Sequence, residues 1–189
     1  MKKIVYMELK KTPVGKIFIG ASPSGLAFLY FGKRPEKKII EQEGKRFGSS
    51  EAFVKIGSAE IRSKMKDTEA QQKILSSAIG QLADYFGGRL KTFKIRKDHA
   101  GLTEFEKKVL QELDKIPCGK TSSYQEIAKK VGKPKAARAV GNAVGRNPFS
   151  LITPCHRVIK SDGSLGGFGA GPSIKKDLLI HEKASTRNL

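Results

Sequence analysis

Three short hydrophobic runs near the N-terminus are separated by turn-forming residues. The runs span residues 4–9, 14–19 and 26–31, and Thr12-Pro13 and the Ser-Pro-Ser-Gly segment at 22–25 lie between them. β-Branched and aromatic residues dominate each run, which is typical of strands. The pattern predicts a small antiparallel sheet.

From Glu69 the hydrophobic spacing becomes that of a helix. Hydrophobic residues recur at helical intervals between Ile74 and Phe86, and Gly87-Gly88 follows, so we predict a helix that stops there. Residues 33–50 are charged and contain Gly and Ser, and we predict an exposed loop or irregular connection. The run at residues 93–95 is interpreted as one more strand.

A Lys- and Arg-rich stretch at residues 96–101 links this region to a second, mostly helical one. Directly after it, Thr103 and Glu106 have the spacing of a capping box, the signature of a helix start. We therefore predict an α+β protein of two domains. Residues 1–98 form a small supporting α/β domain with an antiparallel sheet, and residues 99–189 form a mostly helical domain.

Two further helices of the second domain are joined by a turn that contains Gly132. The first is predicted to start at Ser122 or Ser123, and the second spans about residues 135–146. This is a helix-turn-helix pattern. The outer face of the second helix carries small residues and one long side chain, Arg138, so its backbone can approach a groove; packing against another helix is the alternative. The predicted inner face consists of Ala136, Ala139, Val140, Ala143 and Val144.

The charge of the chain favours an anionic partner. It has 37 Lys and Arg against 18 Asp and Glu, a formal net charge of +19, and such a surplus speeds encounter with a polyanion. No acidic residue occurs between Glu126 and Asp162. The basic residues of this stretch are Lys129, Lys130, Lys133, Lys135, Arg138, Arg146, Arg157 and Lys160. The pattern indicates one positive face for nucleic acid, with a solvated Lys-rich surface as the alternative.

Cysteine and histidine usage narrows the class of protein. Two Cys, Cys118 and Cys155, make no disulfide framework, and the three His have no metal-ligand spacing. The longest apolar runs are too short to span a membrane, and nothing ahead of the first strand resembles a signal peptide. We expect a cytoplasmic protein with reduced thiols and no metal, in which Cys118 is structural.

The segment with the candidate catalytic residues directly follows the helix predicted at about residues 135–146. Residues 147–158 read NPFSLITPCHRV, so an apolar run leads to Cys155. A buried Cys is ordinarily inert, but here His156 can accept its proton and Arg157 adds positive charge, and both favour the thiolate. Glu182 is the candidate carboxylate that orients His156.

The segment Pro154-Cys155-His156-Arg157-Val158 resembles the active-site signature of the O6-alkylguanine-DNA alkyltransferases (methylated-DNA–protein-cysteine methyltransferases). Other segments resemble that family's SYxxIA helix, recognition helix, hinge, substrate loop and closing helix, in this order: residues 119–128, 135–143, 147–148, 163–168 and 178–182. The resemblance is dense over residues 102–183 and looser over residues 1–95.

The resemblance implies a DNA repair protein that flips O6-alkylguanine out of the duplex and transfers the alkyl group irreversibly to Cys155. Residues 99–189 are then the DNA-binding and alkyl-transfer domain. The partner is double-stranded DNA containing O6-alkylguanine. No cofactor and no membrane are implied, and we expect a monomer that reacts once.

The resemblance also implies a role for each site residue. The catalytic residues are Cys155, His156, Glu182, Asn147 and Tyr124. The DNA-binding residues are Arg138, Tyr124, Gln125, Ala137, Lys135 and Ser161. The substrate pocket is lined by Pro154, Val158, Phe168 and Gly169. Phe168 and Gly169 stand where some members carry Tyr and a hydroxyl residue, which leaves the pocket's hydrogen bonding open.

Two other functions fit the residues alone. A Cys-His hydrolase shares the nucleophile, but it needs no basic helix-turn-helix and turns over on esters. A transcription regulator with an inert Cys155 prefers a palindromic site and dimerises. Stoichiometric inactivation by free O6-benzylguanine distinguishes the alkyltransferase from both.

Overall fold

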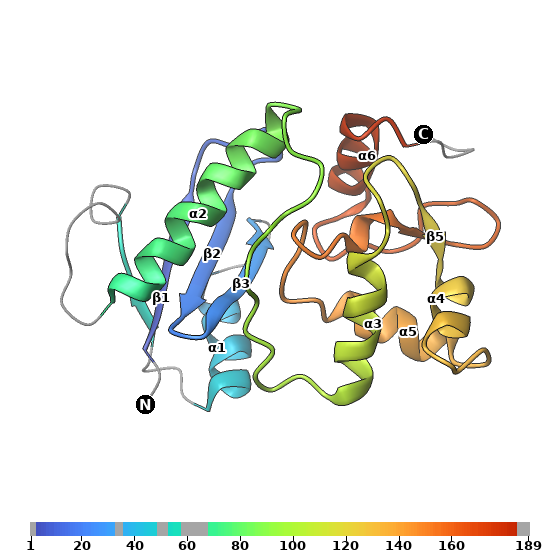
Figure 1. Cartoon of the computed structure of the whole chain (residues 1–189), viewed down its shortest axis with the longest axis horizontal. Helices are drawn as coiled ribbons and strands as arrows, with labels where there is room; N and C mark the ends of the chain where they lie inside the picture. Colours follow the sequence, from blue (N-terminus) through green and yellow to red (C-terminus); the bar gives the residue numbers. More distant parts are fainter. Residues whose placement is uncertain (1–2, 33–35, 49–52, 58–67, 185–189) are drawn as a thin grey trace. The chain divides into compact units, whose positions relative to one another are not determined.

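The computed structural model describes residues 3–32, 36–48, 53–57 and 68–184, and the chain divides into two compact units, Met1–Gly101 and Leu102–Leu189 (Figure 1). The first unit contains a four-stranded sheet and the second is mostly helical, so the predicted α+β class is confirmed. Of the helices described, none is long and apolar enough to cross a membrane.

The sheet of the first unit has the strand order β3-β2-β1-β4. Strands β1 (Ile4–Leu9), β2 (Ile17–Ser22) and β3 (Gly25–Phe31) are antiparallel neighbours, as predicted. The short β4 (Phe53–Lys55), which the hydrophobic pattern did not reveal, pairs parallel with β1. Strand β2 starts later than predicted because Gly15, at φ +85°, closes a turn in which its N–H donates to the Thr12 carbonyl.

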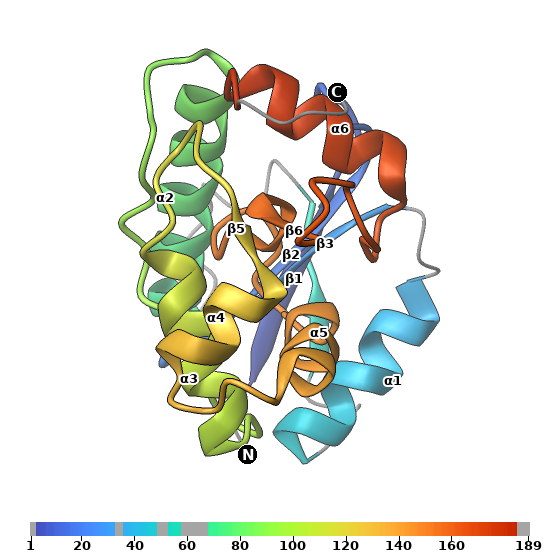
Figure 2. The ribbon, with the colours of Figure 1, turned by 90° about the vertical axis from the view of Figure 1, so that its right-hand side faces the viewer.

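A helix covers each face of this sheet (Figures 1 and 2). Helix α2 (Glu69–Phe86) lies along strands β1 to β3 and buries Leu75, Ala78 and Leu82, which confirms the predicted helix. Because strand side chains alternate between faces, most of the aromatic residues of β1 to β3 gather on the other face, towards α1 (Glu36–Phe47). That cluster includes Tyr6, Phe18, Phe28, Tyr30 and Ile39.

Helix α1 corrects the prediction of a loop over residues 33–50, of which 33–35, 49 and 50 lie outside the described residues. Ile39 and Phe47, eight residues apart and so on one helix face, pack on the aromatic cluster. Its buried Glu43 accepts a 2.6 Å hydrogen bond from the Tyr30 hydroxyl. These tertiary contacts stabilise the helix. The charged composition of the segment gave no indication of them.

The strand predicted at residues 93–95 is not formed. The backbone N–H of Lys94 donates to Gln81 Oε1 at 2.7 Å, so a side chain of α2 takes the place of a strand partner. Pairing with the sheet occurs two residues later, where Lys97 forms a single bridge with Leu26.

The second unit combines four α-helices with small elements around residue 155 (Figure 2). The helices are α3 (Glu104–Asp114), α4 (Tyr124–Lys130), α5 (Ala137–Gly145) and α6 (Pro172–His181). The two-residue strands β5 (Ser122–Ser123) and β6 (Val158–Ile159) pair parallel, and the 3₁₀ helix η2 (Cys155–Arg157) precedes β6. Thr103 and Glu106 form the predicted capping box, and Ser123 rather than Ser122 caps α4.

Helices α4 and α5 pack against each other and against α3. Val140, Ala143 and Val144 point inward as predicted, but Ala139 is exposed, so the buried stripe of α5 is narrower than predicted. Ala136 is only half-buried because it is the N-cap residue and precedes the first helical turn.

Candidate active site

Cys155 opens helix η2, and its side chain is buried, with 5% of the residue exposed. The loop that leads to it from α5 is braced by the buried amide of Asn147. Its Nδ2 donates to the Thr153 carbonyl and its Oδ1 accepts from the Phe149 N–H, both at 2.9 Å. Leu151, inside this loop, has a left-handed backbone at φ +72°, which a leucine adopts only where its surroundings hold it. Asn147 thus fixes the approach to the cysteine.

His156 and Arg157 follow in the same 3₁₀ helix, and both bind the carboxylate of Glu182 at the end of α6. His156 Nε2 lies 3.0 Å from Glu182 Oε1. Arg157 binds the same carboxylate through two bonds, from Nε to Oε2 at 2.8 Å and from Nη2 to Oε1 at 2.7 Å, and its Nη1 donates to the Ile116 carbonyl. The side chains of His156 and Glu182 are completely buried. The three residues form one buried ionic cluster.

Glu182 and His156 have fixed protonation states in this cluster. Burial by itself would raise the pKa of Glu182, but the hydrogen bonds from His156 and Arg157 outweigh it and hold the pKa well below its usual range. Burial is the main cause that lowers the pKa of His156, against the opposing effect of Glu182. A neutral imidazole carries its proton on the nitrogen that faces the carboxylate, which in His156 is Nε2. His156 Nδ1, buried and without a hydrogen-bond partner among the described residues, is left with a free lone pair.

Cys155 is a thiol at rest. Burial raises its pKa, and hydrogen bonding by Asn147 and the charge of Lys175 offset this only in part. The expectation that Arg157 favours the thiolate is not met, because its guanidinium is compensated by Glu182. The sulfur therefore needs a base to become a nucleophile, and the free nitrogen of the neighbouring His156 has the right chemistry.

Tyr124, the first residue of α4, lies between α5 and the loop that follows β6. A Cβ atom on Gly141 of α5 would be 3.8 Å from its ring, and one on Gly166 of the loop would be 3.4 Å from its hydroxyl. Burial, followed by the proximity of Cys155, raises the pKa of the Tyr124 phenol. Its hydroxyl is therefore protonated and can donate a hydrogen bond beside the cysteine.

The predicted pocket residues occupy two different environments. Pro154 and Val158 flank η2 and are buried, whereas Phe168 is half-buried and Gly169 exposed in the loop after β6. The first pair can form the floor of a pocket at Cys155 and the second pair a wall.

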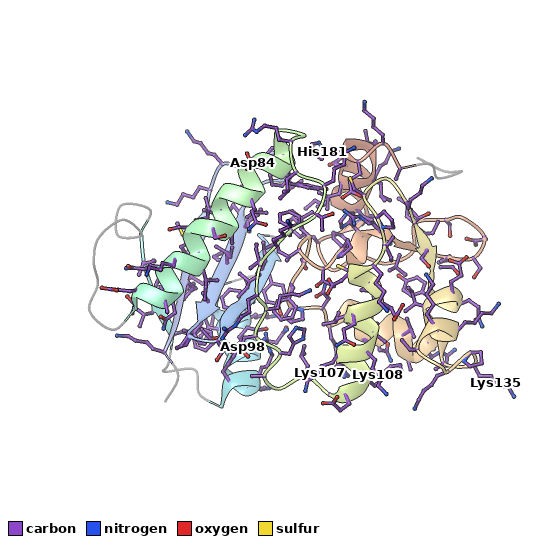
Figure 3. All side chains as sticks on the ribbon, viewed as in Figure 1. Asp84, Asp98, Lys107, Lys108, Lys135 and His181 are labelled. Atoms are coloured by element: carbon purple, nitrogen blue, oxygen red, sulfur yellow. The ribbon has the colours of Figure 1, made fainter. Side chains whose placement is uncertain are left out.

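The predicted DNA-binding residues lie mostly at the surface. Arg138 and Lys135 are exposed at the start of α5 and just ahead of it, and Figure 3 shows Lys135 extending outward there; Ser161 is exposed in the turn after β6. Ala137 is half-buried. Gln125 is half-buried as well, and its amide donates to the Pro134 carbonyl at 2.6 Å, so it also ties α4 to the turn before α5.

One buried ionisable residue of this region was missed from the sequence. Lys175 of α6 is fully buried, and its ammonium donates to carbonyls on β6 and on the following loop. The signal was present, because Lys175 lies on the apolar stripe of α6 formed by Ile174, Leu178 and Leu179. A lysine in such a stripe is buried and must be hydrogen-bonded.

The second unit matches the family model described as "6-O-methylguanine DNA methyltransferase, DNA binding domain" over residues 104–184. Over nearly its full length the chain is similar to the methylated-DNA–protein-cysteine methyltransferase of Methanosarcina barkeri. The two are 37% identical over 183 residues, which cover 97% of this chain and 100% of the relative. The chain belongs to the methylated-DNA–protein-cysteine methyltransferase family.

Solved structures agree with this family. The crystal structure of the O6-methylguanine methyltransferase of Mycobacterium tuberculosis is 32% identical, with a TM-score of 0.74, and the match covers 95% of this chain and 93% of that one. A crystal structure of Mycobacterium tuberculosis OGT in complex with DNA is 33% identical, also with a TM-score of 0.74 and coverages of 95% and 92%. The methyltransferase family thus accounts for both units of the chain.

Replacing Glu182 by Gln removes the anion that His156 and Arg157 share. We expect the free energy of unfolding at pH 7 to fall by roughly 3 kcal/mol, because one partner of a buried ion pair is lost. The pKa of Glu182 is lower in the folded than in the unfolded chain. Its stabilisation is therefore fully present above the ordinary carboxyl pKa of about 4.3 and is lost as the pH falls through the folded value.

Urea titrations at several pH values measure this difference between wild type and variant. It should stay constant near neutrality and shrink below about pH 4.3. Asp177→Asn, at an exposed position of the same helix, is the matched control and should change the stability little. A Glu182→Gln variant as stable as wild type at pH 7 would contradict the shared-anion arrangement.

Proposed function

We propose that the chain is a DNA repair protein that takes O6-alkylguanine out of duplex DNA and transfers the alkyl group irreversibly to Cys155. The observation that carries the proposal is the buried array of Cys155, His156 and Glu182, in a unit that matches the DNA-binding domain of this family. Relatives are named methylated-DNA–protein-cysteine methyltransferases, and a similar solved structure is a complex with DNA.

The transfer is a single displacement at carbon. The Cys155 thiol gives its proton to His156 Nδ1, directly or through water, while Nε2–H stays on Glu182. The sulfur attacks the alkyl carbon, the bond from that carbon to guanine O6 breaks, and its electron pair remains on the purine. The Tyr124 hydroxyl assists by donating a hydrogen bond to the purine, which then recovers a proton. The product is a thioether that the site cannot hydrolyse, so each molecule reacts once.

Access to the buried O6 position requires base flipping. Helices α4 and α5 serve as a helix-turn-helix, in which the small outer residues of α5 let its backbone approach the groove. The exposed Arg138 then enters the stack and fills the space that the flipped base leaves. Lys135, Gln125 and Ser161 bind the backbone around it, with the surplus positive charge of the chain adding attraction. We propose that the protein acts as a cytoplasmic monomer.

Intact-protein mass after mixing with a duplex that contains O6-methylguanine tests the reaction. Wild type should gain one methyl group, which peptide mapping places on Cys155. Cys155→Ala should gain none and still bind the duplex, and Cys118→Ala is the matched control that should react like wild type. An unchanged wild-type mass with intact DNA binding would indicate a regulatory protein, and turnover on esters would indicate a hydrolase.

Arg138→Ala tests the role of this side chain in flipping. Transfer from duplex DNA should slow roughly tenfold, because Arg138 offsets part of the few kcal/mol that unstacking a base costs. Transfer from free O6-benzylguanine, which needs no flipping, should keep its rate. Arg146→Ala removes a second exposed arginine, after the end of α5, and should affect duplex repair less. Equal slowing of both substrates by Arg138→Ala would rule out the flipping role.

A further inference from the structure

The ammonium of Lys175 binds three backbone carbonyls on two segments of the chain. It donates to the Val158 carbonyl on β6 at 2.5 Å, to the Leu165 carbonyl, and to the Gly167 carbonyl at 3.4 Å. The residue is completely buried in α6, so these bonds replace the water that a lysine ordinarily keeps. One side chain of α6 thereby joins the strand next to η2 to the middle of the following loop.

The loop at residues 160–171 carries Phe168 and Gly169, the two residues assigned above to a wall of the candidate substrate site. Its first part is a tight turn in which the Lys160 N–H donates to the Ser164 carbonyl and the Gly163 N–H to the Lys160 carbonyl. Its middle places Gly166 beside the Tyr124 hydroxyl, between Leu165 and Gly167, whose carbonyls Lys175 binds. The bonds of Lys175 therefore act at the part of the loop that faces a catalytic candidate.

The glycine content of this loop makes such an anchor necessary. Gly163, Gly166, Gly167, Gly169 and Gly171 lie within nine residues, and glycine has the largest backbone freedom of any residue. Three of them have a positive φ, Gly163 at +85°, Gly166 at +68° and Gly171 at +97°. Without tertiary bonds, a segment of this composition samples many conformations, and ordering it on substrate binding costs free energy.

We propose that Lys175 is a positioning residue for alkyl transfer, whose buried ammonium fixes the middle of the 160–171 loop against β6 and so preforms the wall of the substrate site beside Tyr124. This inference rests on the proposed function. Lys175 acts through the loop and is not itself assigned contact with the guanine. A preformed wall lowers the ordering cost of binding the alkylated base.

The charge of Lys175 supports the same arrangement. Arg157 and Glu182 compensate each other, whereas the bonds described for the Lys175 ammonium are to carbonyls, and no described carboxylate pairs with it. Burial lowers the pKa of Lys175 to about 8, and the proximity of Cys155 counteracts this. Its ammonium form, which has three N–H donors for three carbonyls, is favoured further when Cys155 ionises.

Lys175→Met removes the three donors and keeps an unbranched side chain that is one atom shorter. The matched control is Lys176→Met, the same change at the exposed neighbouring position of α6. Two readouts are compared in the full-length variants: hydrogen exchange of residues 160–171, and the rate of alkyl transfer to Cys155 from free O6-benzylguanine as its concentration is varied.

The expected result is faster exchange in residues 160–171 of Lys175→Met alone, with transfer at subsaturating O6-benzylguanine slowed roughly tenfold or more. The half-saturating concentration should rise, because the wall must be ordered on binding. Lys175→Arg, which keeps charged donors, should recover part of both. Affinity for unmodified duplex DNA, a property of α4 and α5, should change by less than about twofold.

Exchange and transfer equal to those of Lys176→Met would overturn the proposal. So would slowed transfer with unchanged exchange of the loop, since Lys175 would then act through its charge alone. If Lys175→Met fails to fold, the same comparison is made with Lys175→Gln, which retains N–H donors and is expected to fall between Met and Arg. If wild type itself transfers no alkyl group, the proposed function fails, and loop exchange in the variants still decides whether Lys175 holds the loop.

Discussion

The buried carboxylate of Glu182 is the interaction on which the rest of the active site depends. It accepts hydrogen bonds from two consecutive residues of one 3₁₀ helix, His156 and Arg157. An unpaired guanidinium or carboxylate at this depth would cost several kcal/mol, so α6 must close on η2 with Glu182 in register. The same closure brings Lys175, two helical turns earlier, to the strand and loop that follow η2.

The carboxylate of Glu182 gives different roles to His156 and Arg157. Arg157, bound at two oxygens, keeps Glu182 ionised and loses its own influence on the thiol. Glu182 in turn holds the proton of His156 on Nε2, which leaves Nδ1 as the basic nitrogen. Burial raises the pKa of Cys155 and holds it as a neutral thiol until that base acts.

Much of this site could be predicted from residue order, and the parts that could not have physical reasons. Cys155 and His156 follow from one local motif, and Glu182 follows from the need of a buried imidazole for a carboxylate at a helix end. The two hydrogen bonds from Arg157 to Glu182 join residues 25 positions apart in the sequence. No local sequence pattern predicts such a pair. The burial of Lys175 could have been predicted, because this cation lies in the apolar stripe of α6. Its hydrogen-bond partners could not, because their carbonyls belong to another segment.

In the fold too, elements with a local sequence signal were predicted and elements held by tertiary contacts were not. Strands β1 and β3 and helix α2 carry their own periodicity and turns and were predicted close to their bounds, and the start of α3 was predicted from its capping box. Helix α1 and strand β4 were not, because α1 is charged and is held by Glu43 and the aromatic cluster, and β4 has only three residues. Residues 93–95 have a strand-like composition, but the Gln81 side chain accepts a hydrogen bond from the Lys94 backbone in place of a neighbouring strand. Tertiary partners decided each of these cases.

The most direct test of this account is the protonation state of His156, measured by NMR from the ring nitrogen shifts of protein labelled with ¹⁵N-histidine. The signal is assigned by its loss in His156→Gln. We predict a neutral imidazole protonated on Nε2, which persists as the pH is lowered through the ordinary histidine pKa of about 6.5. An imidazolium at neutral pH, or a proton on Nδ1, would leave Cys155 without its base and contradict the role assigned to Glu182.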